Sequence, residues 1–253
     1  MNLKEFLKTL PKIEKGQKVI SILSGGLDST TLLYVLIKKY RKENVIAVTY
    51  NYGQKLDYEI RCAQETTKKL GVYHKIIDIS FLGEVTSPVC SIVKKGKEIP
   101  RVEETLGDPQ CSTYVPYRNQ ILLTLGFAIA ESNNAQYVFY GAQNNDVYHY
   151  WDTTSEFLMR LNSVSYLNRK HKIQAIAPFI NYDKADEIKW GVELGVDYSK
   201  TWSCYEKNDG NKACGVCSSC SDRIQHFMKA GIKDPLEYKI NIDWEQGFKK
   251  FKE

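Results

Sequence analysis

The sequence predicts an α/β fold, a doubly wound parallel sheet followed by a small C-terminal module that carries four cysteines. Short apolar runs of strand type alternate with segments of helical periodicity over residues 18–79, and the alternation resumes after residue 119. A glycine-rich turn directly follows the first apolar run, where parallel sheets bind ligands. After Gly195 the chain becomes rich in cysteine and glycine. We therefore expect an α/β domain over residues 1–199 and a four-cysteine module with its tail over residues 200–253.

The first half of the chain predicts three strands joined by helices, after a polar-apolar lead-in. The lead-in over residues 1–16 favours a short helix that ends at Gly16. The elements expected next are a strand over 18–23, a helix over 30–40, a strand over 44–50, a helix over 56–70 and a strand over 74–79. Because a helix separates each pair of strands, the pattern is typical of parallel βαβ units.

The second half predicts two more strands after an irregular stretch. Between Leu82 and Pro116 the periodicity fails, and an irregular segment of that length is typical of a functional lid or of disorder. The elements expected after it are a helix over 119–132, a strand over 137–140, a helix over 154–168, a strand over 173–177 and a helix over 183–194. The last helix is expected to be capped by Asn181 or Asp183 and closed by Gly195.

Composition excludes several classes of protein. A hydrophobic content of 43% supports a packed core, while no apolar stretch is long enough to span a bilayer. The N-terminus lacks the apolar core and cleavage site of a signal peptide, so a cytoplasmic location is expected. The net charge of +5 is mild and spread out, and no nucleic-acid partner or membrane contact is expected from it.

The glycine-rich turn has the residues of a phosphate-binding site. It runs Ser24-Gly25-Gly26-Leu27-Asp28-Ser29. Adjacent glycines leave backbone N–H groups open to an anion, and the following helix adds its dipole. Hydroxyls of Ser24, Ser29 and Thr30 can donate to phosphate oxygens. The Asp28 carboxylate would repel phosphates unless a cation lies between them, which predicts Mg²⁺ here. The spacing fits neither a Walker A loop nor a dinucleotide fingerprint.

Four cysteines have the spacing of a metal site. Their pattern is C-x9-C-x2-C-x2-C, formed by Cys204, Cys214, Cys217 and Cys220. Zinc takes four thiolates in a tetrahedron, and a closed shell of this kind favours one structural Zn²⁺ per chain over a catalytic one. An iron–sulfur cluster also uses four cysteines and stays open as an alternative. Disulfides are disfavoured in a reducing cytosol.

The phosphate loop resembles the Ser-Gly-Gly-x-Asp-Ser motif of the N-type ATP pyrophosphatases, the PP-loop superfamily. That resemblance implies an adenine nucleotide alpha hydrolase-like fold and cleavage of ATP between its α and β phosphates, with transfer of AMP to a substrate oxygen. It also implies that one continuous segment binds ATP: Leu23, Ser24, Gly25, Gly26, Leu27, Asp28, Ser29, Thr30, Thr31, Leu32 and Leu33.

Together, the loop and the cysteines resemble the QueC family of 7-cyano-7-deazaguanine synthases. Further segments share the likeness: residues 51–55 with Glu59, residues 112–119, Gly141 with Asp146, residues 150–152, residues 177–178 with Lys184, and residues 201–205. The resemblance implies a carbon–nitrogen ligase of queuosine precursor synthesis. Its substrates would be ATP, ammonia and 7-carboxy-7-deazaguanine, joined through an adenylated carboxylate. A homodimer is also implied.

The resemblance gives roles to a few side chains. Ser24, Asp28 and Arg118 are the expected catalytic residues, with Arg118 as a clamp for phosphate or for the substrate carboxylate. Asp146 and Asp152 are expected to accept from the guanine-like N–H edge. Aromatic rings that can stack on the substrate are Tyr52, Tyr117, Tyr148 and Trp151. The competing interpretations are a surface arginine, solvated or helix-capping acids, and packing aromatics.

Three other functions stay open at this stage. A diverged relative could attach a deazaguanine to a macromolecule such as a protein terminus. An adenylating enzyme that modifies tRNA would need a catalytic cysteine pair, for which only Cys90 and Cys111 are spare. A non-enzymatic zinc-ribbon that binds nucleic acid would need a basic face, but the charges around the four cysteines are nearly balanced.

Overall fold

The computed structural model describes residues 1–100, 108, 110–143, 150–206 and 212–251, and its centre is a parallel five-stranded sheet. The strand order is β3-β2-β1-β4-β5. The strands are β1 (Lys18–Ile22), β2 (Val45–Asn51), β3 (Tyr73–Asp78), β4 (Ala135–Phe139) and β5 (Gln174–Ile176). All four pairings are parallel, which confirms the predicted sheet.

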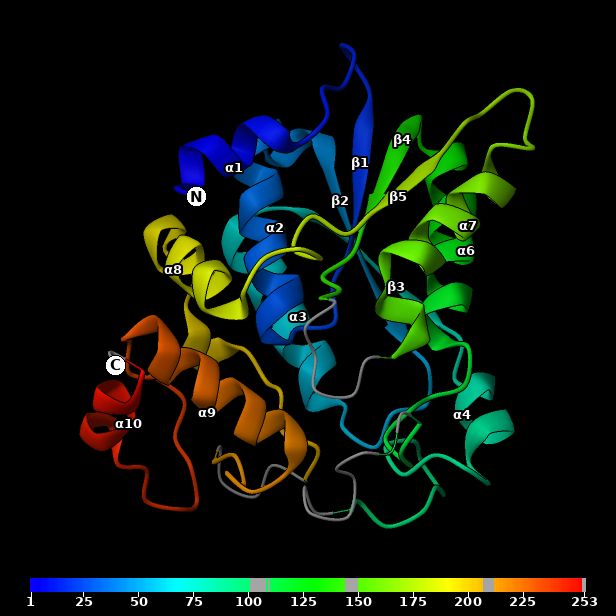
Figure 1. Ribbon diagram of the computed structural model, residues 1–253. Helices are drawn as coiled ribbons and strands as arrows, with labels where there is room; N and C mark the ends of the chain where they lie inside the picture. The colour runs from blue at the N-terminus through cyan, green and yellow to red at the C-terminus, as the bar shows by residue number, and fades with distance from the viewer. Residues whose placement is uncertain (101–107, 109, 144–149, 207–211, 252–253) are drawn as a thin grey trace.

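Helices cover both faces of the sheet, as a doubly wound fold requires (Figure 1). One face is covered by α1 (Leu3–Thr9), α2 (Leu27–Tyr40), α3 (Tyr58–Leu70) and α8 (Lys184–Leu194). The other is covered by α6 (Arg118–Ser132) and α7 (Ser155–Ser165). Two more helices, α9 (Ser218–Ala230) and α10 (Trp244–Lys250), follow α8 at the lower left of Figure 1. Short 3-10 turns cover Lys42–Asn44, Trp151–Thr153 and Tyr198–Lys200.

Burial explains why the apolar runs become strands. Every residue of β2 except Asn51 is buried, because helices lie against both of its faces. At the sheet edge, β3 has no fully buried residue, and the Tyr73 ring is 61% exposed. The core therefore lies on β1, β2 and β4, whose carboxyl ends point to one edge of the sheet.

The N-terminal lead-in forms a helix that closes one end of the core. Its capping box joins Asn2 and Glu5, which satisfies backbone donors at both residues. The Phe6 side chain is fully buried and its ring stacks on Trp190 with centroids 4.2 Å apart. The helix ends at Thr9, well before the Gly16 expected from the sequence, because Pro11 lies just beyond its C-cap Leu10.

The segment predicted as irregular between Leu82 and Pro116 begins with a helix. This helix, α4 (Phe81–Thr86), was missed because one turn of buried contacts is too short for periodicity to show. Leu82 and Thr86 share its buried face, and the Thr86 hydroxyl donates to the Leu82 carbonyl over 2.7 Å. After α4 the chain bridges back to the end of β2 through Gln54 and Val93.

The C-terminal part packs against the sheet domain. Helix α9 lies against α8, and ion pairs join Lys184 to Asp222 and Lys229 to Asp183. Asp183 also caps α8, as the sequence predicted. The division of the chain at residue 199 stays a prediction. Over the described residues, the structure contains no helix with the length and apolar character needed to cross a membrane.

We expect Phe6→Ala to destabilise the fold, because it empties a site between Trp190 and Phe179. Loss of a fully buried phenylalanine costs about 3 kcal/mol or more. For a chain of this size, that corresponds to a fall of roughly 6–12 °C in melting temperature, measured by thermal unfolding. The matched control is Phe81→Ala, since that ring is 63% exposed. Equal melting temperatures for the two variants would contradict the role given to α1.

Candidate active site and metal centre

A cavity of about 430 Å³ opens at the carboxyl ends of β1, β2 and β4. β2 and then β3 follow on one side of β1, and β4 and then β5 follow on its other side. The carboxyl end of β1 is therefore the switch point of the strand order, where open α/β sheets bind ligands. The walls are formed by the turn after β1, the end of β2, the start of α3, residues 113–119, residues 140–143 and the first turns of α9. Size and position are those of a small-molecule site.

The turn after β1 is ordered by its own serines. The Ser24 and Ser29 hydroxyls lie 2.9 Å apart, and the Ser24 amide donates to the Ser29 hydroxyl over 3.1 Å. Gly26 is the N-cap of α2 and has no side chain to cap it, so the first amides of the helix are left for another acceptor. An anion is the acceptor that such a helix end favours.

Gly25 is fixed by packing. Its φ is +92°, and a Cβ there would lie 2.1 Å from the Glu59 carbonyl oxygen of α3. On its other side, the Gly25 carbonyl accepts from the Trp202 amide over 3.1 Å. Gly25 does not line the cavity, so here a glycine is required by α3 rather than by the ligand.

The predicted ATP segment is longer than the wall that the structure builds from it. Leu23, Ser24, Gly26, Leu27, Asp28 and Ser29 line the cavity. Thr30, Thr31, Leu32 and Leu33 are buried and do not line it. Leu32 and Leu33 belong to the core against the sheet, because the second turn of α2 faces the strands. Direct contacts of these four residues with ATP therefore find no support in the cavity wall and stay a prediction.

A charged cluster stands beside the loop. Lys184 Nζ lies 2.6 Å from Asp222 Oδ2 and 3.7 Å from Asp28 Oδ1, and its side chain is 9% exposed. Burial alone would raise the pKa of Asp222, yet Lys184 and His226 hold that pKa well below its usual range. Under this cluster the Glu187 carboxyl is fully buried, and burial together with Asp28 raises its pKa.

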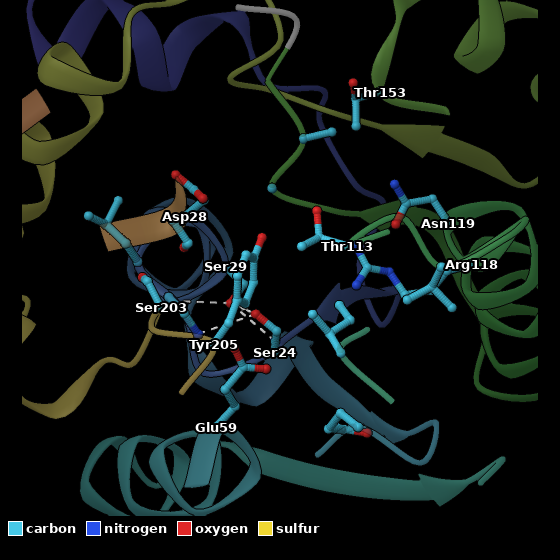
Figure 2. Close-up of a pocket in the computed structure, with 18 of the residues that line it drawn as sticks. Ser24, Asp28, Ser29, Glu59, Thr113, Arg118, Asn119, Thr153, Ser203 and Tyr205 are labelled. Atoms are coloured by element: carbon cyan, nitrogen blue, oxygen red, sulfur yellow. Dashed lines mark hydrogen bonds between the residues drawn. The ribbon is translucent and has the colours of Figure 1, made fainter. Parts of the chain in front are cut away.

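Arg118 forms the opposite wall with Tyr52 and Asp152. Its guanidinium donates to the Tyr52 hydroxyl over 3.3 Å and lies 5.5 Å from the centre of that ring. Figure 2 shows it reaching into the cavity from α6, which favours the predicted clamp over an arginine on the outer surface. The Asp152 side chain is buried, and burial raises its pKa while Arg118 opposes the rise.

Glu59 projects from α3 toward the phosphate loop (Figure 2). Burial raises the pKa of its carboxyl to about 7, with Arg118 lowering it in part. The sequence placed Glu59 in a segment that resembles the QueC family but gave it no role. Helical spacing alone could not reveal that it faces a cavity, because its position depends on the contact of α3 with Gly25.

The other predicted aromatic and acidic residues have mixed outcomes. Tyr52 lines the cavity, whereas Tyr117 is 59% exposed and Trp151 packs on Phe157. Neither Tyr117 nor Trp151 lies in the cavity wall, so the structure gives no support for stacking by these two rings. Asp146 and Tyr148 lie outside the described residues. Wall residues given no role from the sequence include Asn119, Gln143, Tyr150, Lys184, Tyr205 and Asp222.

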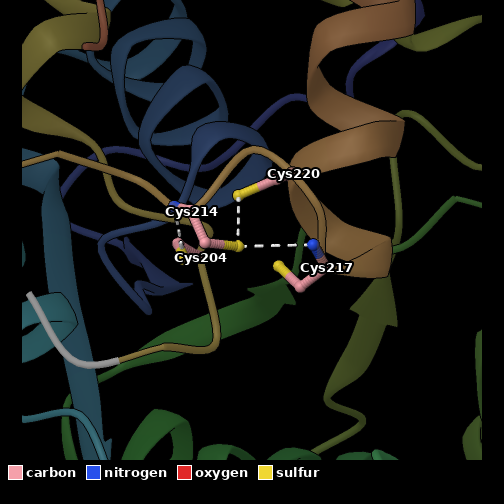
Figure 3. A group of neighbouring side chains, drawn as sticks. All are labelled: Cys204, Cys214, Cys217 and Cys220. Atoms are coloured by element: carbon pink, nitrogen blue, oxygen red, sulfur yellow. Dashed lines mark hydrogen bonds between the residues drawn. The ribbon is translucent and has the colours of Figure 1, made fainter. Parts of the chain in front are cut away.

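The four cysteines come together at the start of α9 (Figure 3). The sulfurs of Cys204, Cys214, Cys217 and Cys220 all lie within 4.8 Å of one another, and all four residues are buried. Backbone amides donate to two of the sulfurs: Cys204 Sγ accepts from Cys214, and Cys214 Sγ accepts from Cys217. Such donors stabilise thiolates, so the cluster can hold a metal ion.

Comparisons with known proteins agree with the loop and the cysteines. A family model described as queuosine biosynthesis protein QueC matches residues 18–231. The 7-cyano-7-deazaguanine synthase of Caldicellulosiruptor saccharolyticus is 40% identical over 229 residues, covering 90% of this chain and 99% of that protein. That of Pseudoalteromonas atlantica is 39% identical over 225 residues, covering 88% and 99%. Among solved structures, the NH3-dependent NAD synthetase from Campylobacter jejuni matches with a TM-score of 0.48 at 15% identity, covering 79% of this chain and 76% of that chain.

We expect Gly25→Ala to abolish nucleotide binding and to lower the melting temperature, because its Cβ would meet the Glu59 carbonyl oxygen and force the loop away from α3. The matched control is Gly16→Ala. Gly16 has a similar φ of +84°, but a Cβ there meets nothing within 4 Å. Both variants carry the left-handed strain of about 1–2 kcal/mol, so their difference measures the close approach alone. Calorimetric titration with ATP and thermal unfolding would test this, and similar results for both variants would argue against it.

Proposed function

The chain belongs to the QueC family of queuosine biosynthesis proteins, and we propose that it converts 7-carboxy-7-deazaguanine and ammonia to 7-cyano-7-deazaguanine at the expense of ATP. Relatives named 7-cyano-7-deazaguanine synthase match it over almost their whole length. The observation that carries the proposal is one cavity with a helix N-terminus at one side and a guanidinium at the other. These two ends suit a phosphate and a carboxylate.

The chemistry needs both ends of the cavity. A carboxylate is a poor electrophile, so its oxygen first attacks the α phosphate of ATP and pyrophosphate leaves. Ammonia then displaces AMP and gives an amide. A second ATP activates the amide oxygen in the same way, and loss of AMP with the remaining N–H protons gives the nitrile. The protein contributes positioning and charge stabilisation at each step.

We place the leaving pyrophosphate at the loop. Support comes from the open amides at the start of α2 and from the paired hydroxyls of Ser24 and Ser29. Asp28 lines the same wall and offers a carboxylate to Mg²⁺, which would neutralise charge on the phosphates. Lys184 lies within 4 Å of Asp28 and adds positive charge at this end.

We place the deazaguanine acid at the opposite wall. Arg118 is the clamp for its carboxylate, since a guanidinium in the cavity wall can bind both oxygens. The Tyr52 ring lies against the Arg118 guanidinium and lines the cavity. Among the described residues, Asp152 is the acceptor for the guanine-like N–H edge of the substrate. A role for Asp146 stays a prediction.

We propose that the four cysteines hold one structural Zn²⁺. A tetrahedral Zn²⁺ with bonds of about 2.3 Å separates its sulfurs by about 3.8 Å. The Cys214 and Cys220 sulfurs lie 3.9 Å apart, and no sulfur of the group is more than 4.8 Å from another. Thiolates around four irons stand farther apart than thiolates around one ion, so this spacing favours zinc over an iron–sulfur cluster.

The rival functions find less support. Cys90 and Cys111 are both buried, and the Cys111 thiol is engaged with Thr113 and Tyr150, so neither offers the accessible pair that sulfur transfer to tRNA needs. A diverged relative that attaches a deazaguanine to a macromolecule would use the same cavity, so only the reaction products distinguish it from the proposed synthase. The cytoplasmic location and the homodimer stay predictions.

The test is to incubate the protein with ATP, Mg²⁺, ammonium and 7-carboxy-7-deazaguanine and to follow the nitrile by mass. We expect nitrile, AMP and pyrophosphate to accumulate together. Asp28→Ala should abolish all three products without changing the zinc content, because it removes the carboxylate beside the phosphates. Asp186→Ala, on the first turn of α8, is the control and should be fully active. Absence of nitrile from the folded wild-type protein would rule out the proposed reaction.

We expect Cys217→Ser to lose the metal and to unfold the C-terminal segment, since structural zinc contributes on the order of 10 kcal/mol to such modules. Elemental analysis and limited proteolysis would show this as zinc-free protein that is cleaved after residue 200 or is insoluble. Cys90→Ser replaces an equally buried cysteine that is not part of the cluster and should keep its zinc. A soluble, active and zinc-free Cys217→Ser protein is the result that would contradict a structural zinc.

A further inference from the structure

Glu59 is a carboxyl in the cavity wall that the roles assigned so far do not use. It lies in the first turn of α3, on the side that touches the phosphate loop, and lines the same cavity as Ser24 and Arg118. The structure forms no hydrogen bond or ion pair to its carboxyl from any described residue. A partly buried carboxyl without a protein partner is costly unless a ligand completes it.

The groups that face Glu59 come from three other elements. Tyr52 follows β2, Arg118 begins α6, and Tyr205 follows the last 3-10 turn; each interacts electrostatically with the Glu59 carboxylate. On α3 itself the neighbour is Cys62, a buried thiol whose pKa is raised mainly by burial and then by Glu65 and Glu59. Arg118 is thus the one permanent cation in this set, and it is already bonded to the Tyr52 hydroxyl.

The only other wall carboxyl with a raised pKa on this side is Asp152, among the described residues, and it is differently placed. Asp152 lies beside Asn119, whose side-chain amide donates to the Asp152 backbone carbonyl over 3.4 Å; burial raises the pKa of the Asp152 carboxyl, and Arg118 and then Asn119 oppose the rise. No donor among the described residues is bonded to the Glu59 carboxyl, and Figure 2 shows that carboxyl directed at the loop end of the cavity. The acyl carbon of an adenylate must lie between the loop, which holds phosphate, and Arg118, which holds the acid. Glu59 faces that interval.

We propose that Glu59 binds the ammonium ion beside the acyl adenylate and takes one of its protons. This inference rests on the proposed synthase function and adds a residue for the step in which nitrogen enters. Ammonium is the dominant form of the substrate near neutral pH, but only neutral ammonia has the lone pair that attacks carbon. Negative charge from Glu59 and the adenylate phosphate collects the cation at the point where it must react.

The proton and electron balance is complete within the site. Glu59 carboxylate and ammonium exchange a proton and give the carboxylic acid and ammonia. The ammonia lone pair forms a C–N bond at the acyl carbon, and the C–O bond to AMP breaks with its electrons going to AMP. The extra proton on nitrogen leaves to solvent or to AMP, and the protonated Glu59 returns its proton to water. A carboxyl whose pKa lies near 7 can make this exchange in both directions.

The experiment compares two nucleophiles in the Glu59→Gln variant at pH 7. Hydroxylamine is mostly neutral at that pH, because its conjugate acid is stronger than ammonium, so it attacks the adenylate without a base and gives a hydroxamate. We expect Glu59→Gln to lower the formation of amide and nitrile from ammonium by about 100-fold or more. Hydroxamate formation and the exchange of pyrophosphate into ATP that depends on the deazaguanine acid should stay within a few-fold of wild type.

Glu65→Gln is the matched control, because it makes the same change on the exposed face of the same helix. Glu59→Asp keeps a carboxylate and should retain more use of ammonium than Glu59→Gln. Undiminished use of ammonium by Glu59→Gln overturns the inference, and so does an equal loss with both nucleophiles or a loss of the exchange. A wild-type protein that shows no exchange at all would instead overturn the proposed function, so the two failures are distinguishable.

Discussion

The close approach of the Gly25 backbone to α3 is the constraint on which the site depends. A Cβ at Gly25 would lie 2.1 Å from the Glu59 carbonyl oxygen, and the Gly25 carbonyl is bonded to the Trp202 amide. The loop after β1, the first turn of α3 and the segment before the cysteines therefore meet at one residue. Because backbone atoms make these contacts, they fix the loop whatever the surrounding side chains do.

The cavity that results has hydrogen-bond donors at both ends and carboxyls between them. The open amides of α2 lie at one end, beside Lys184 and its partners Asp222 and Asp28, and Arg118 lies at the other. Such ends attract two anions toward each other, although the anions repel in water. Burial raises the pKa of Glu59 and of Asp152 between these ends, and Arg118 opposes the rise at both carboxyls.

Much of this arrangement was predictable from the sequence, and what was missed has a physical reason. Five strands and the helices between them followed from periodicity, because buried strands and half-buried helices need different spacings of apolar residues, whereas α9 and α10 were not predicted. The loop and the four cysteines were predictable since their chemistry depends on short spacings. The motif alone could not show that Ser29 lines the cavity whereas Leu33 belongs to the core, because only the packing of α2 decides which turn faces the cavity. The place of Glu59 in the cavity wall could not be predicted, because it depends on the tertiary contact between α3 and Gly25.

The cysteine cluster lies close to the cavity. Cys217 caps α9 and Cys220 lies in its first turn, and the same turns of α9 line the cavity through Ser218, Ser221 and Asp222. Behind them the Arg223 guanidinium is buried in a two-point ion pair with Asp234 and also donates to the Thr201 hydroxyl. Next to Thr201 is Trp202, the residue bonded to Gly25. A metal on the cysteines would therefore set the position of α9 and, through this chain of contacts, the position of the phosphate loop.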